Sequence, residues 1–78
     1  MIKDIKKIDQ HVGQRLFQQR ELLGWSRENL AHLIGISHQQ IQNYEEGLKP
    51  IFVDHLYQLS EALSVPITFF YEGVDTQG

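Results

Sequence analysis

Residues 26–47 read SRENLAHLIGISHQQIQNYEEG, and this stretch decides the fold. It holds two segments of helix length, each preceded by a serine and separated by Gly35. Ser26 and Ser37 are good N-cap residues, and glycine is common just after a helix C-terminus. Two short helices joined by a tight turn that contains glycine form a helix-turn-helix. We therefore predict this motif, with one helix on each side of Gly35.

The second helix of this motif has an unusual outward surface. Ser37 and Gln40 have the spacing of a capping box, and Ile41 and Tyr44 are expected to face inward. The other positions carry almost no charge and are His38, Gln39, Gln40, Gln42, Asn43 and Glu46. Surface helices gain from Lys–Glu pairs, whereas Gln and Asn can make two hydrogen bonds to adenine in the major groove. The pattern favours base reading by His38, Gln39, Gln42 and Asn43 over an ordinary solvated face.

Four polar residues around the motif are candidate contacts for DNA phosphates. Arg27 lies in the first turn of its helix, where it opposes the helix dipole. A phosphate at that helix N-terminus would satisfy both the arginine and the free N–H groups. Ser37, Gln40 and Lys49 complete the candidates, with capping or plain solvation as their ordinary alternatives.

A charge pair is expected to join two of the helices. Arg20 lies four residues after Leu16 and three before Leu23, so its base falls on an apolar stripe. Glu45 lies four residues after Ile41 on a second stripe. Opposite charges on two core-facing stripes predict a partly buried ion pair, the alternative being an arginine that reaches solvent along its stem.

Outside residues 26–47, apolar residues at helical spacing predict three more helices. The first runs from Asp9 as its N-cap to Leu23, the second covers about 53–63, and a last short helix begins at Pro66. The apolar residues behind these predictions are Val12, Leu16, Leu23, Leu56, Leu59, Ala62, Leu63, Phe69 and Phe70. The expected fold is all-α, with five short helices around one core.

The 78 residues allow one domain, which we place at 9–73, between an N-terminal arm at 1–8 and a flexible tail at 74–78. A hydrophobic fraction of 41% and a charged fraction of 22% are typical of a folded chain. The net charge is -3, but residues 1–49 hold seven basic and six acidic residues, whereas 50–78 hold four acidic residues and no basic one. In so short a chain, chance is the alternative explanation of this uneven distribution. Because the basic residues are concentrated in the first half, the negative net charge does not exclude nucleic-acid binding.

Several classes of protein are disfavoured. The chain has no cysteine, which excludes disulfides, thiolate zinc sites and cysteine nucleophiles. It has no G-x-S-x-G, Walker A or H-E-x-x-H pattern, and its four histidines lack metal-ligand spacing. We therefore expect no enzymatic activity, no cofactor and no metal. No apolar run approaches the ~20 residues of a membrane span and no secretory signal is present, so we expect a cytoplasmic protein without membrane contact.

Residues 12–72 resemble the lambda-repressor-like, Cro-type helix-turn-helix DNA-binding domain, the XRE family. The matching text is VGQRLFQQRELLGWSRENLAHLIGISHQQIQNYEEGLKP, followed by LYQLSEALSVPITFF. The resemblance implies a DNA-binding domain that is usually a homodimer on an operator of two-fold symmetry, and we expect a small transcriptional regulator that acts as a repressor. It assigns phosphate contacts to Arg27 and Ser37, an ion pair to Arg20 and Glu45, and base reading to the exposed face of the second motif helix.

This chain departs from the family pattern at several positions. The family often has Gln where Arg27 stands, and it tends to have a Ser cap where Phe52 stands. A large apolar residue at 52, near Tyr57, suggests a subunit interface. Gly47 is followed by Leu48 and Lys49 instead of two basic residues, which reduces the expected number of phosphate contacts.

A protein-interaction module is the alternative function. The same fold would then serve as an antitoxin that binds a toxin-like partner, with or without DNA. The contacts would come from the acidic, aromatic second half, through Phe52, Tyr57, Phe69, Phe70 and Tyr71. DNA binding predicts a steep loss of affinity with salt, whereas a purely protein-binding module predicts no affinity for duplex DNA at low salt.

Overall fold

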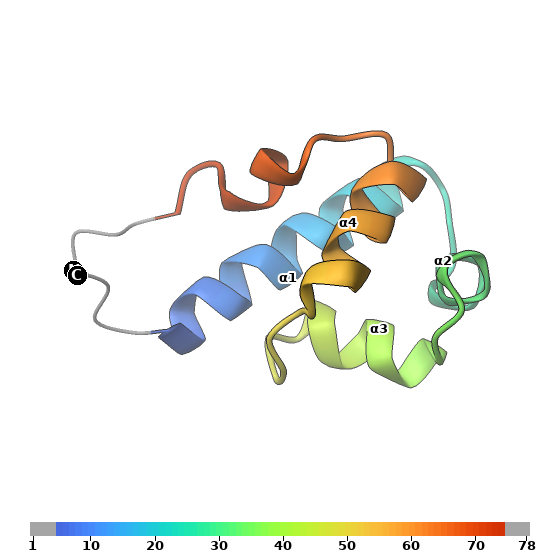
Figure 1. The fold of residues 1–78 in the computed structure, drawn as a ribbon, viewed down its shortest axis with the longest axis horizontal. Coiled ribbons are helices and arrows are strands. Elements are labelled where there is room, and N and C mark those ends of the chain that lie inside the picture. Colours follow the sequence, from blue (N-terminus) through green and yellow to red (C-terminus); the bar gives the residue numbers. More distant parts are fainter. Residues whose placement is uncertain (1–4, 75–78) are drawn as a thin grey trace.

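Four α-helices and one short 3-10 helix make up the part of the chain that the computed structural model describes, residues 5–74. The helices are α1 (Ile5–Leu22), α2 (Arg27–Ile34), α3 (His38–Glu45), α4 (Val53–Ala62) and the 3-10 helix η1 (Ile67–Tyr71). The long α1 packs against α3 and η1, α2 packs against α3 and α4, and α4 packs against η1 (Figure 1). No helix within 5–74 is both long and apolar enough to cross a membrane.

The prediction of five α-helices is wrong at the C-terminal end. The segment after Pro66 is a five-residue 3-10 helix, and Pro66 precedes it instead of starting it. A segment this short suits the tighter 3-10 geometry, which is found mainly in runs of a few residues. Phe70 is nevertheless fully buried and Phe69 packs against the core, so the segment closes the core as expected.

The first helix also differs from its prediction. α1 begins at Ile5, before the expected N-cap Asp9, so residues 5–8 of the proposed arm are helical. Ile8 explains the extension because it packs against the core one turn before Val12. The other part of the arm, residues 1–4, lies outside the described residues, as does most of the tail (75–78). Leu23, expected on the buried stripe, is exposed.

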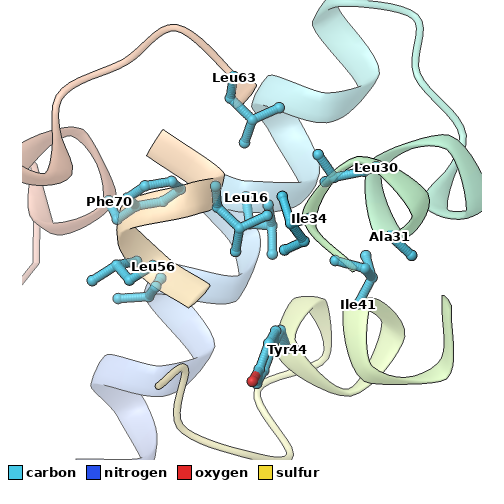
Figure 2. Packing of buried hydrophobic residues seen from close by; sticks show 11 residues of the cluster. Leu16, Leu30, Ala31, Ile34, Ile41, Tyr44, Leu56, Leu63 and Phe70 are labelled. Atoms are coloured by element: carbon cyan, nitrogen blue, oxygen red, sulfur yellow. The ribbon is translucent and has the colours of Figure 1, made fainter. Parts of the chain in front are cut away.

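Buried side chains from all five elements form one apolar core (Figure 2). Leu16 of α1, Ile41 of α3 and Phe70 of η1 are among its fully buried members. The whole cluster consists of Val12, Leu16, Leu30, Ala31, Ile34, Ile41, Tyr44, Leu56, Leu59, Leu63 and Phe70. Tyr44 of α3 lies at the edge of the cluster in this view, with its hydroxyl oxygen turned away from the other labelled side chains (Figure 2). One face of α3 is therefore committed to packing, which leaves the opposite face for other roles.

The helix-turn-helix has the local structure that its sequence predicts. Ser26 caps α2 by accepting a hydrogen bond from the Asn29 N–H. Gly35 then takes a left-handed conformation with φ 77°, which glycine adopts without steric cost. Three residues, Gly35 to Ser37, separate α2 from α3. This tight connection fixes the N-terminus of α3 beside the C-terminus of α2.

The C-terminal segment is fastened to α1 by two side chains. Arg15 donates from Nε to the Phe69 carbonyl at 2.9 Å and from Nη2 to Glu72 Oε1 at 2.9 Å. Its guanidinium also lies 3.8 Å from the centroid of the Phe69 ring. His11 Nε2 donates to the Glu72 carbonyl at 2.7 Å. These contacts hold η1 and the residue that follows it against α1.

Candidate nucleic-acid interface

The four predicted base-reading residues lie on α3, away from its buried residues Ile41, Tyr44 and Glu45. His38 and Gln39 are exposed, whereas Gln42 and Asn43 are half-buried. Gln39 Nε2 donates to Asn43 Oδ1 at 3.2 Å, and Gln42 Nε2 donates to Glu46 Oε2 at 3.1 Å. These pairs keep the amides on one face, with the Gln39 carbonyl and the Asn43 NH2 group available for a base edge.

The capping box at the start of α3 is confirmed. The Ser37 hydroxyl accepts from the Gln40 N–H at 3.1 Å, and Gln40 Oε1 accepts from the Ser37 N–H at 3.4 Å. The box fixes where α3 begins. It uses the amide oxygen of Gln40 but leaves its NH2 group, and it leaves the proton of the Ser37 hydroxyl as a donor.

The predicted ion pair between Arg20 and Glu45 is also present, and it is buried. Arg20 donates from Nε to Glu45 Oε2 at 2.6 Å and from Nη2 to Oε1 at 3.2 Å. Its Nη1 donates to the Trp25 carbonyl at 2.7 Å and to Glu21 Oε2 at 3.3 Å. The hydrogen bonds with Glu45 raise the pKa of Arg20 above its usual range despite burial. The pair holds the C-terminal end of α3 against α1.

Glu45 has a second partner that the sequence did not predict. Arg27 donates from Nε to Glu45 Oε1 at 2.8 Å, so one buried carboxylate joins arginines from α1 and α2. No simple spacing relates Arg27 and Glu45, which lie on different helices. The contact could have been predicted only from the knowledge that both residues lie at helix ends that adjoin in the fold.

The two cationic phosphate candidates line separate hollows beside α3. Arg27 and His38 line an open hollow between the end of α1 and the starts of α2 and α3. Lys49 lines a smaller pocket of about 200 Å³ together with Gln40 and Asn43. Cationic side chains therefore stand in two hollows next to α3, and Lys49 is exposed and lies in a loop.

Two of the four histidines, His11 and His55, make hydrogen bonds in this structure. Among the described residues, no three His, Asp or Glu side chains come together to hold a metal ion. The Tyr44 hydroxyl and His55 Nδ1 share a 2.7 Å hydrogen bond beneath the loop that follows α3. Burial raises the pKa of the Tyr44 phenol above its usual 10.0, and the charge of Asp54 adds to the shift.

An apolar surface lies at the start of α4. Phe52, Val53 and Tyr57 are 62%, 81% and 54% exposed, and Phe52 occupies the N-cap without making a side-chain hydrogen bond. We call these three residues the α4 patch. Of the aromatic residues proposed for protein binding, Phe70 is unavailable because it is buried in the core.

Comparison with known proteins gives the family. The helix-turn-helix family pattern matches residues 16–70. The chain is 44% identical over 73 residues to an uncharacterized transcriptional regulator in the ATPase CF(0) region of Rhodospirillum rubrum. It is 42% identical over 81 residues to an uncharacterized helix-turn-helix-type transcriptional regulator of Sinorhizobium medicae. The alignments cover 94% and 100% of this chain, but only 68% and 58% of those two relatives.

A solved structure supports the same assignment. The restriction-modification controller protein C.AhdI from Aeromonas hydrophila matches with a TM-score of 0.76 and 27% sequence identity. The match covers 80% of this chain and 94% of the controller protein. Sequence and structure therefore agree that the chain belongs to the XRE-type helix-turn-helix family of transcriptional regulators.

Proposed function

We propose that this chain binds specific double-stranded DNA sequences in the cytoplasm and represses transcription, with α3 inserted in the major groove. The observation that carries the proposal is the α3 face itself. It combines four hydrogen-bonding side chains with little charge, and it is rigidly held by the buried pair Arg20–Glu45. Repression is the simpler mode of action because a bound protein blocks a promoter by occupancy alone.

The chemistry of the face matches base edges. Gln39 and Asn43 would read adenine through paired hydrogen bonds to N6 and N7. His38 and Gln42 supply further donors and acceptors at the start and the middle of α3. In the free protein the amides pair with side chains one turn away, so the exchange for a base edge needs only side-chain rotation.

Phosphate contacts would fix α3 in the groove. Arg27 at the start of α2 and Lys49 after α3 supply charge, and Ser37 and Gln40 supply neutral donors at the start of α3. This set holds only two positive charges, so non-specific affinity should be modest and should fall with salt. Specific contacts and dimerisation would then provide the remaining affinity.

We propose the α4 patch as the surface through which two copies pair on an operator of two-fold symmetry. Exposed aromatic residues without hydrogen-bond duties suit a subunit interface. The alternative occupant is a different protein, such as a toxin-like partner. Because the relatives are longer than this chain, further partners of the whole protein stay open.

The proposal is tested with Gln39→Ala and a matched control, Gln58→Ala, which removes an exposed amide from α4. Binding of both variants to a panel of duplexes is measured by fluorescence anisotropy at several salt concentrations. Gln39→Ala should reduce discrimination between preferred and altered sites by about 1–3 kcal/mol, while Gln58→Ala should change nothing. Equal losses on every duplex would contradict base reading at Gln39. Absence of duplex binding at low salt would contradict the DNA function.

A further inference from the structure

Arg27 is held by Glu45 through one of its three nitrogens. The contact is the 2.8 Å hydrogen bond from Nε to Glu45 Oε1. The side chain of Glu45 is 2% exposed, whereas that of Arg27 is 33% exposed. The carboxylate is therefore fixed inside the protein, and the guanidinium lies at the surface with its Nε anchored.

The Glu45 carboxylate is shared by two arginines. Arg20 already neutralises the carboxylate through two hydrogen bonds and is itself buried. Arg27 is a second cation on the same carboxylate, while Arg20 also pairs with Glu21 at 3.3 Å. Arg27 is the more exposed of the two arginines on Glu45, so its guanidinium is presented at the surface, in the hollow that also contains Glu21, Glu28 and His38.

The planar geometry of the guanidinium group determines where the remaining N–H groups of Arg27 point. Arginine has five N–H donors in a planar fork, and one edge can bind a carboxylate while the terminal nitrogens bind another anion. With Nε on Glu45, rotation of the Arg27 side chain is restricted. The terminal nitrogens are then preset for an anion at the hollow, and less rotational freedom is lost on binding.

We propose that Glu45 is a positioning residue for DNA binding, because it holds Nε of Arg27 and directs the terminal nitrogens of that arginine to one DNA phosphate. The inference rests on the proposed DNA-binding function. It couples the phosphate contact at α2 to the ion pair that joins α1 and α3. Glu45 touches no DNA itself and acts through Arg27.

Variants of Arg27 test this idea better than variants of Glu45, because Glu45→Gln also leaves the buried Arg20 without its counter-charge. Arg27→Lys keeps the positive charge but replaces the fork with a single ammonium group. The ammonium group binds either Glu45 or a phosphate. Because the Glu45 carboxylate is fixed next to it, we expect the ammonium group to bind Glu45. Arg15→Lys is the matched control, since it makes the same exchange in the clamp that holds η1.

Affinity is measured on the tightest duplex selected from a random DNA pool, as a function of salt. We expect Arg27→Lys to lose about ten-fold in affinity, close to the loss for Arg27→Ala. In both variants the plot of log K against log salt should become shallower by about one unit. Arg15→Lys should bind this duplex like the unmodified protein, even where its melting temperature falls.

A spectroscopic readout follows the hydrogen bond itself. The Nε–H resonance of Arg27 is identified in nitrogen-15 NMR spectra by its absence from Arg27→Lys. In the free protein it should exchange slowly with water. It should stay protected in the DNA complex, because Nε remains on Glu45 while the terminal nitrogens contact the phosphate.

Each contrary outcome has its own meaning. Arg27→Lys with unchanged affinity and salt slope would show that charge alone suffices, and the positioning role would fall while the DNA function stands. Loss of Nε–H protection on DNA binding would show that Arg27 leaves Glu45, which also overturns it. An unchanged slope for Arg27→Ala would remove Arg27 from the phosphate contacts. Failure of the unmodified protein to bind any duplex would instead overturn the proposed function.

Discussion

The carbonyl oxygen of Tyr44 in α3 occupies the space that a β-carbon on Gly13 of α1 would need. A β-carbon there would also lie 2.8 Å from the carbonyl oxygen of Glu45. The two helices therefore meet backbone to backbone at the end of α3. Gly13 is required here by space, because its neighbours are main-chain atoms that cannot rotate away.

Gly13→Ala should destabilise the fold. In an exposed helix interior, replacing glycine by alanine stabilises the protein by about 1 kcal/mol. Here the added methyl group must push α3 away from α1, which should cost roughly 1–3 kcal/mol. Urea denaturation followed by circular dichroism measures the change. Gln14→Ala, at the next and exposed position of α1, should leave the free energy of unfolding nearly unchanged. A stabilised Gly13→Ala protein would contradict the close approach.

Removing one side of the buried ion pair should cost far more than removing its surface member. Arg20→Met leaves the Glu45 carboxylate without its main counter-charge and should lower the free energy of unfolding by about 3–5 kcal/mol. Arg27→Met removes a partly exposed arginine and should cost about 1 kcal/mol or less. Thermal and urea denaturation compare the two. Equal costs would show that both arginines support Glu45 to the same degree.

The double variant Arg20→Met with Glu45→Met should recover part of the lost stability. Replacing both charges by apolar groups of similar volume is often neutral, because no unpaired buried charge remains. The double variant should therefore unfold at a higher urea concentration than Arg20→Met alone. If the double variant unfolds at a lower urea concentration, the Glu45 carboxylate stabilises the fold by more than its ion pair with Arg20.

Local patterns in the sequence predicted much of the fold and of the site. Serine caps, glycine after a helix and apolar spacing act within a few residues, so they placed α2, α3 and the capping box of Ser37 and Gln40 correctly. The Arg20–Glu45 pair was also predicted, because each residue lies on the buried side of its own helix. The exposed Leu23 shows that the stripe ends earlier than its spacing suggests.

The errors and omissions involve contacts made across the fold. The early start of α1 depends on Ile8 packing against the core, and the 3-10 geometry of η1 depends on its short length after Pro66. The contact between Arg27 and Glu45 joins two helices whose relative placement no local pattern encodes. Such contacts arise only when the helices pack, so single-sequence reasoning could not predict them.

Stability should fall at alkaline pH because of Tyr44. Burial raises the pKa of its phenol in the folded protein above the usual 10.0, so above about pH 10 the unfolded chain releases this proton first. The contribution is complete below that pH and is lost as the pH rises through the raised value. Tyr44→Phe should therefore show a weaker decline in urea midpoint between pH 9 and 11.

The titration of Tyr44 can be observed directly. In a protein with Tyr57→Phe and Tyr71→Phe, the phenolate absorbance reports Tyr44 alone, since the chain has three tyrosines. The midpoint should lie above that of free tyrosine. A midpoint at or below that of free tyrosine would contradict the burial of the phenol beside His55.

The α4 patch can be tested by Tyr57→Ser, with Leu22→Ser as a control at an exposed apolar residue of α1. Sedimentation velocity should show that Tyr57→Ser shifts a dimer toward monomer, because burial of an aromatic ring is lost. Leu22→Ser should keep the dimer. A fully dimeric Tyr57→Ser protein would show that the subunit interface lies elsewhere.

The central claim is sequence-specific DNA binding through α3, and selection from a random duplex pool tests it most directly. The unmodified chain and Gln39→Ala are selected in parallel, and the enriched duplexes are footprinted. We predict an enriched site with two half-sites related by two-fold symmetry, about 34 Å apart, in which Gln39→Ala relaxes one position of each half-site. A pool in which no sequence is enriched, or an identical preference for both proteins, would contradict base reading by this face.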